Sequence, residues 1–251
     1  MGADPAASTP LVDRALAHAG VAARLVVLGG AGAGKTTLLD ALAARWHDDD
    51  RPVTRLAGRR LEASCPGWAL DAVLDPAELA GLGSGDLAAE RRVLDRLVAL
   101  GGKGGVLVVD NGQWLDRCSL RLLSGAAERR AAMVLAARPA GRADLAALVE
   151  ALGDEGTMLP LAPLGSDEVA RMAEDAVGRV PDPALVSSLL DRSAGIPGWL
   201  VRLLAAGGVG AGGERPRPLD PAGSLVARVR AALDQLSEAA RVVVVALGAG
   251  A

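Results

Sequence analysis

The chain has 251 residues, of which 51% are apolar, and its formal net charge is −3. This length and apolar content allow one large domain or two smaller ones with a sizeable core. No stripe of lysine and arginine stands out, which argues against direct nucleic-acid binding by this segment. Cys65 and Cys118 lack metal-ligand spacing, and no apolar run approaches the ~20 residues of a membrane span. We therefore expect a cytoplasmic protein without membrane contact.

The first informative stretch is a glycine-rich loop between an apolar run and a helical pattern. The apolar run 25–28 predicts a strand, after a short helix over 11–19, and residues 36–46 predict the helix that follows the loop. The loop fits G-x-x-x-x-G-K-[ST], whose backbone N–H groups cradle phosphates. We expect the phosphate-binding residues to be Gly29, Gly30, Ala31, Gly32, Ala33, Gly34, Lys35, Thr36 and Thr37.

A second informative stretch is the apolar run 106–109, which ends in Asp110. It predicts a fully buried strand whose terminal carboxylate lies in the crevice that also holds the phosphates. In that crevice Thr36 and Asp110 would hold Mg²⁺, directly or through water. The motif is weak alone, but it becomes specific some seventy residues after a phosphate-binding loop.

Further runs complete the pattern of alternating strands and helices. Residues 53–57, 131–137 and 157–161 predict three more strands, and 144–152 predicts a helix. Arg138 follows the run 131–137, so we expect it at the same crevice, where it would sense the terminal phosphate. From residue 163 onward the pattern becomes helical throughout.

The chain carries five blocks in order: the phosphate-binding loop (P-loop), the stretch from Leu107 to Asp116 with its Asp-x-x-Gln-Trp-x-Asp pattern, Val134 to Pro139, Leu161 to Leu164, and Ser193 to Leu200 with its Ala-Gly-x-Pro pattern. Together they resemble the STAND class of AAA+-related signalling ATPases, in the form found in large LuxR-type transcriptional regulators. The resemblance implies an α/β P-loop NTPase with a five-stranded parallel sheet between helices. A helical lid and a winged-helix region would follow it.

The resemblance also implies a division of the chain and a set of roles. Residues 1–162 would form the nucleotide-binding domain, 163–206 the lid, 207–223 a linker and 224–251 the truncated start of the winged-helix region. ATP and ADP with Mg²⁺ would select different conformations. By position, Lys35, Asp110 and Arg138 would serve catalysis, with Asn111 beside Asp110, and Gly195 and Pro197 would place the lid over the base.

Two departures from the family pattern limit the expected activity. The family has a second acidic residue directly after the aspartate of the Walker B motif, which is Asp110 here, whereas this chain has Asn111. An amide orients water but does not accept its proton, and a positioned general base is typically worth ~10²–10⁴-fold. We therefore expect nucleotide binding with slow hydrolysis, with Asp116 as a candidate substitute base. The N-terminal Gly-Arg-Glu box is reduced to a remnant at residues 12–15.

The favoured hypothesis is a nucleotide-dependent switch, which leaves open self-association or a protein partner that depends on the nucleotide. One alternative is a P-loop small-molecule kinase, whose lid usually carries several arginines over the phosphates. Another is a scaffold that uses a degenerate nucleotide fold for protein contacts. The scaffold hypothesis predicts that Mg²⁺ and ATP leave the fluorescence of Trp114 unchanged.

Overall fold

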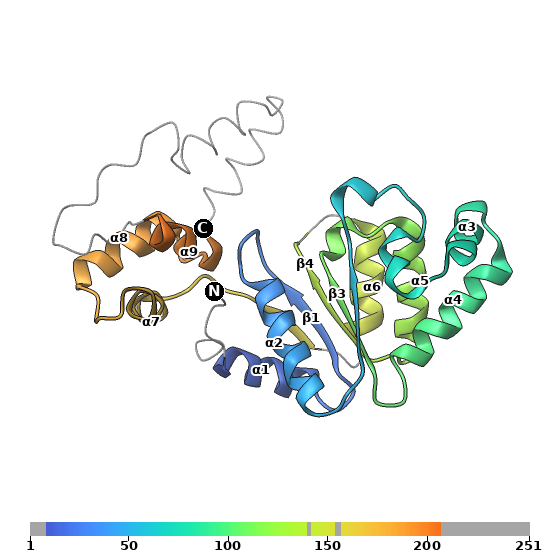
Figure 1. The fold of residues 1–251 in the computed structure, drawn as a ribbon, viewed down its shortest axis with the longest axis horizontal. Helices are drawn as coiled ribbons and strands as arrows, with labels where there is room; N and C mark the ends of the chain where they lie inside the picture. The colour runs from blue at the N-terminus through green and yellow to red at the C-terminus, as the bar shows by residue number, and fades with distance from the viewer. Residues whose placement is uncertain (1–8, 140–141, 154–156, 207–251) are drawn as a thin grey trace, which may run out of the picture. The chain divides into compact units, whose positions relative to one another are not determined.

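The computed structural model describes residues 9–139, 142–153 and 157–206 (Figure 1). The expected linker and winged-helix start fall outside the described residues. The elements in chain order are α1 (Thr9–Ala19), β1 (Arg24–Leu28), α2 (Lys35–Asp48), β2 (Val53–Ala57), α3 (Pro76–Ser84), α4 (Leu87–Leu100), β3 (Val106–Asp110), α5 (Arg117–Glu128), β4 (Met133–Ala137), α6 (Ala143–Gly153), β5 (Thr157–Pro160), α7 (Ser166–Val177), α8 (Pro183–Ser193) and α9 (Pro197–Ala205).

The five strands form one parallel sheet in the order β2-β3-β4-β1-β5. The expected α/β fold with a five-stranded parallel sheet is thus confirmed. Parallel strands need crossover connections, and helices supply them here. Since β4 lies between β3 and β1, the carboxyl ends of these three strands are neighbours at one edge of the sheet.

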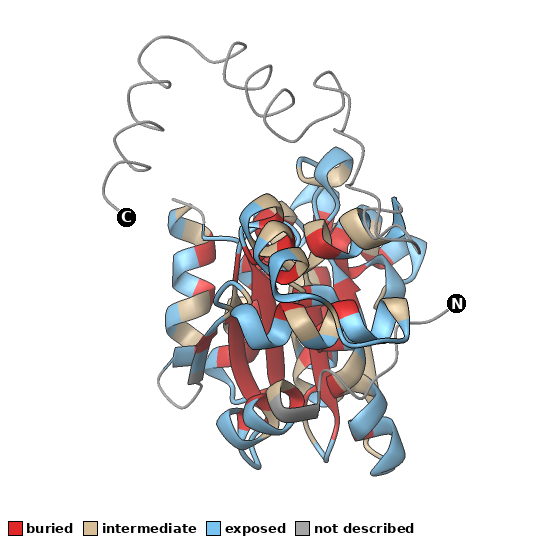
Figure 2. Cartoon of the chain, turned by 90° about the vertical axis from the view of Figure 1, so that its left-hand side faces the viewer, coloured by how far each residue is buried: buried red, intermediate tan, exposed pale blue. Residues whose placement is uncertain are grey.

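Helices cover both faces of the sheet, with α1 and α2 on one side and α4, α5 and α6 on the other (Figure 1). Alternation along the strands explains the two layers, because successive side chains point to opposite faces. In β1, Val26 packs in the cluster with α4–α6, whereas Leu25 and Val27 pack in the cluster with α1 and α2. Figure 2 shows the resulting buried strands between helices whose outer faces are exposed.

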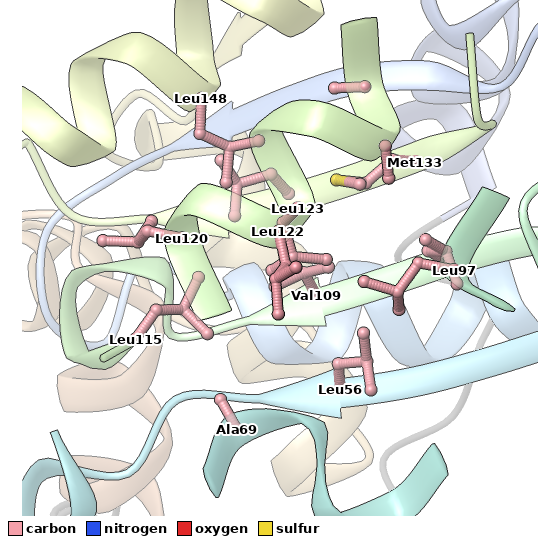
Figure 3. Close-up of a cluster of buried hydrophobic side chains, with 14 of the residues drawn as sticks. Leu56, Ala69, Leu97, Val109, Leu115, Leu120, Leu122, Leu123, Met133 and Leu148 are labelled. Carbon is pink, nitrogen blue, oxygen red and sulfur yellow. The ribbon is translucent and has the colours of Figure 1, made fainter. Parts of the chain in front are cut away.

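Small aliphatic side chains build the core, because the chain has no Phe and no Tyr. Leucines of α5 lie in one buried cluster with Leu97 of α4 and with Val109 and Met133 of the sheet (Figure 3). Leu120, Leu122 and Leu123 supply the α5 contribution, and Leu123 has no exposed surface. This layer holds the end of β3 in place, and β3 carries Asp110.

A buried arginine ties the start of β1 to the helices on this face. The Arg24 guanidinium donates to the carbonyl oxygens of Ala127 (2.8 Å), Ala131 (3.4 Å) and Ala151 (2.5 Å). Ala127 and Ala151 lie in the last turns of α5 and α6, where carbonyls lack intrahelical partners and a cation is stabilising. The apolar pattern placed the strand start at Leu25, one residue late, because a charged side chain masks the buried position.

The strand expected over 131–137 begins two residues later than predicted, at Met133. The N–H of Ala131 donates to Ala126 and that of Ala132 donates to Gly101. Those donors therefore pair with the end of α5 and with the residue after α4 rather than with the sheet.

Within the described residues, no helix has both the length and the apolar character needed to cross a membrane.

Truncating Leu123 to alanine should lower the free energy of unfolding by about 2–5 kcal/mol, because it opens a cavity among fully buried leucines. Leu61→Ala is the matched control, since the side chain of Leu61 is 94% exposed and should change stability by less than about 0.5 kcal/mol. Guanidinium denaturation measures both values. Equal small losses would contradict the assigned core.

Candidate functional site

The glycine-rich loop leaves the carboxyl end of β1 and enters α2 at Lys35. Gly34 precedes the helix with φ of 88°, a left-handed backbone conformation that residues other than glycine rarely adopt. No side chain caps the start of α2. Its first N–H groups therefore remain available at the positive end of the helix dipole, which favours an anion.

Lys35 is buried beside the loop and bonds to it. Its Nζ donates to the carbonyl oxygens of Gly29 (2.8 Å) and Gly30 (2.6 Å), and the residue is 7% exposed. Burial lowers the pKa of Lys35, the positive charge of Arg138 lowers it further, and the carboxylate of Asp110 opposes both effects. A phosphate group would offer the ammonium charged acceptors in place of the two carbonyls.

Thr36 and Asp110 meet across the crevice between β1 and β3. The Thr36 hydroxyl donates to Oδ2 of Asp110 at 2.7 Å, and the other carboxylate oxygen accepts the N–H of Asn111 at 2.7 Å. Mg²⁺ usually takes one or two protein oxygens and completes its shell with phosphate and water. One hydroxyl and one carboxylate on adjacent elements fit that requirement, and the bound ion would neutralise phosphate charge.

Asn111 follows Asp110 in a left-handed conformation, with φ of 55°. Asparagine and aspartate tolerate this region better than other residues with side chains. Its Oδ1 accepts a hydrogen bond from Nε2 of Gln113 at 3.2 Å. The structure therefore places an amide, held by a neighbour, directly after Asp110.

Arg138 follows β4, the strand between β1 and β3. Its backbone N–H donates to Oε1 of Gln113 at 3.0 Å, and its charge acts on Lys35. The predicted residues Lys35, Thr36, Asp110, Asn111 and Arg138 are thus gathered at one edge of the sheet. Residues 140 and 141 lie outside the described residues.

The segment expected to act as a lid reaches the loop through residues next to the predicted ones. The N–H of Gly198 donates to the carbonyl of Gly32 at 2.9 Å, and a Cβ on Gly198 would lie 3.0 Å from Cα of Gly32. A Cβ on Gly32 would lie 3.2 Å from the side chain of Ile196. The predicted Pro197, between them, is the first residue of α9.

Gly195, the other predicted residue of this segment, contacts a different part of the chain. Its carbonyl accepts the N–H of Leu164 at 2.7 Å, and a Cβ on it would come 2.5 Å from the Leu164 carbonyl oxygen. Its φ is 68°, so the position combines close backbone approach with a left-handed turn. Gly195 therefore fixes the turn before α9 against the segment that follows β5.

Asp116 is not a substitute base, and this expectation is corrected. The residue is 2% exposed, and its carboxylate accepts the N–H groups of Gly67 (2.9 Å), Ala69 (3.4 Å) and Ser119 (2.9 Å) and the Ser119 hydroxyl. It caps α5 and holds the turn before the 3₁₀ helix Trp68–Val73. Because its carboxylate accepts four hydrogen bonds at these distances, Asp116 has a structural role.

A cavity of about 210 Å³ adjoins Thr36 and Asp110 on the side of β2. Its lining includes Asp40 and Arg55, which form an exposed ion pair, and Arg59. The cavity widens the crevice beyond the carboxylate of Asp110. It therefore belongs to the same site and supplies mixed charge at its outer wall.

Among solved structures, the chain is similar to ORC1 of Aeropyrum pernix in complex with DNA, at a TM-score of 0.56 and 19% identity, covering 95% of this chain and 70% of that one. It is similar to a Walker-type ATPase of Pyrococcus abyssi, at 0.55 and 17%, covering 83% and 68%. DnaA of Aquifex aeolicus bound to AMPPCP gives 0.53 and 13%, covering 84% and 63%. These likenesses show that the chain shares the fold of these three proteins, a parallel sheet between helices.

No family model matches the chain, and no curated protein matches it. The chain spans 59–61% of the length of the Thermotoga maritima RuvB structures that it also resembles.

Replacing Asp116 by alanine should lower the free energy of unfolding by about 2–4 kcal/mol, because buried donors lose their acceptor. Asp182→Ala is the matched control: Asp182 caps α8 through Ala184 alone, so about 1 kcal/mol should be lost. Chemical denaturation compares the two variants. A loss for Asp116→Ala no larger than that of the control would refute the structural role.

Proposed function

We propose that this chain is the nucleotide-binding part of a signalling switch, which binds ATP or ADP with Mg²⁺ at the glycine-rich loop. The observation that carries the proposal is the meeting of Lys35, Thr36 and Asp110 at the carboxyl ends of β1 and β3. Uncapped N–H groups, an ammonium group and a metal-binding oxygen pair complement a triphosphate tail in charge and in hydrogen-bond type.

Hydrolysis at this site is slow. Asn111 replaces the carboxylate that would take a proton from the attacking water, and Asp116, with its four donors, gives no substitute. Asp110 is engaged with Thr36 and the backbone of Asn111. The site then holds ATP for a long time, which suits a switch better than a motor.

Residues 163–206 act as a lid over the nucleotide domain of residues 1–162. Support comes from the hydrogen bond between Gly198 and Gly32, which joins the start of α9 to the tip of the loop. A nucleotide that reorders the loop would alter this bond and thereby the lid. The blocks that resemble LuxR-type regulators favour transcription regulation as the setting, with a protein partner or self-association reading the state of the lid.

Removing the Lys35 ammonium should weaken the binding of ATP with Mg²⁺ about tenfold to a hundredfold, because a charge-assisted bond to phosphate is lost. Lys103→Ala is a matched control, since Lys103 is the only other lysine and is exposed. Isothermal titration calorimetry measures both affinities. Unchanged affinity in Lys35→Ala, or no binding by the unsubstituted chain, would favour the scaffold alternative.

Asn111→Asp should raise the rate of ATP hydrolysis by about 10²-fold or more, because it supplies a proton acceptor beside Asp110 without straining a left-handed backbone. Asn111→Gly is the control, since it keeps the backbone conformation and removes the side chain. Phosphate release at saturating ATP measures the rate. If Asn111→Asp were as slow as Asn111→Gly, hydrolysis would be limited elsewhere.

A further inference from the structure

Gln113 lies between two parts of the site, and the proposed function assigns it no role. It lies in the short 3₁₀ helix Gly112–Trp114 after β3 and is 6% exposed. One end of its side-chain amide contacts the backbone of Arg138 after β4, and the other end contacts the side chain of Asn111. Its backbone carbonyl also accepts a bond from Arg142 at 3.1 Å, which holds the short helix in position.

The donors and acceptors of these hydrogen bonds determine how the side-chain amides of Gln113 and Asn111 are oriented. A backbone N–H only donates, so the Gln113 atom facing Arg138 must be the acceptor Oε1. The Nε2 group of Gln113 then faces Asn111 as a donor, and Asn111 must present its oxygen. The Nδ2 group of Asn111 makes no hydrogen bond to another described residue, and Asn111 is partly exposed. That nitrogen is the atom left for a ligand.

Resting on the proposed function, we infer that Gln113 is a positioning residue that holds Asn111 with its N–H donors toward the terminal phosphate. A donor there stabilises the phosphate oxygens of ATP that ADP lacks. The same orientation denies the attacking water an acceptor. By holding Asn111, Gln113 makes the site bind ATP more tightly than ADP and hydrolyse it slowly. Because Gln113 also bonds to the backbone of Arg138, this preference depends on the position of the end of β4.

Exchanging one amide for a carboxylate should reverse the orientation. In Gln113→Glu both oxygens accept, so one keeps the N–H of Arg138 and the other requires a donor from Asn111. Asn111 then turns its Nδ2 group toward residue 113 and presents Oδ1 to the phosphate. Two facing acceptors repel, so the preference for ATP over ADP should fall.

The test compares four proteins in the presence of Mg²⁺: the unsubstituted chain, Gln113→Glu, Asn111→Gly and the double variant. Calorimetry gives the dissociation constants of ADP and of a β,γ-methylene analogue of ATP, so the readout is independent of hydrolysis. We expect Gln113→Glu to lower the ADP-to-analogue ratio of dissociation constants about tenfold. In the Asn111→Gly background, Gln113→Glu should leave the ratio unchanged.

The outcomes separate this inference from the function on which it rests. If the unsubstituted chain binds neither nucleotide, both are overturned. If it prefers the ATP analogue and Gln113→Glu retains the preference, only the inference is overturned. An equal loss with and without the Asn111 side chain would also overturn it, because the added charge would then act directly. Should Gln113→Glu fail to fold, Gln113→Met must lower the ratio by releasing Asn111, or the inference is wrong.

Discussion

The hydrogen bond between Thr36 and Asp110 joins the two halves of the site, and the order of the strands makes it possible. Thr36 belongs to the helix that follows β1, and Asp110 ends β3, two strands away in the sheet. Parallel pairing aligns the carboxyl ends of β1, β4 and β3, so residues distant in sequence converge without a dedicated connection. The leucines of α5 pack behind β3 in the same buried cluster.

The electrostatics of the crevice follow from that convergence. Lys35 and Arg138 are cations on neighbouring elements, and burial together with the positive charge of Arg138 lowers the pKa of Lys35. One carboxylate, Asp110, partly offsets them. A bound triphosphate would reverse this excess of positive charge, and a divalent cation beside Asp110 would offset part of the added negative charge. The protein thus holds positive charge ready for an anion and satisfies Lys35 with the carbonyls of its own loop.

Patterns of local sequence predicted the sheet and the residues that line its edge. The apolar run after Gly105 gave β3 with its observed bounds, because buried parallel strands are apolar on both faces. The bounds of β2 were also predicted, although β2 lies at one side of the sheet and is less buried. The loop at Gly29–Thr36 was recognisable since its chemistry depends on consecutive residues. The sequence could not show that Gln113 bridges Asn111 and Arg138, because that contact depends on the spacing of β3 and β4. Asp116 was misread for the same reason, as two of its donors lie almost fifty residues upstream.

A structure of the chain crystallised with Mg²⁺ and a non-hydrolysable ATP analogue would test the central claim most directly. The account predicts the phosphates within the loop at Gly29–Thr36, with Nζ of Lys35 moved from the carbonyls of Gly29 and Gly30 to phosphate oxygens. The metal would then lie between the Thr36 hydroxyl and the carboxylate of Asp110. A nucleotide bound elsewhere, or a filled loop in which Lys35 still contacts those carbonyls alone, would contradict it.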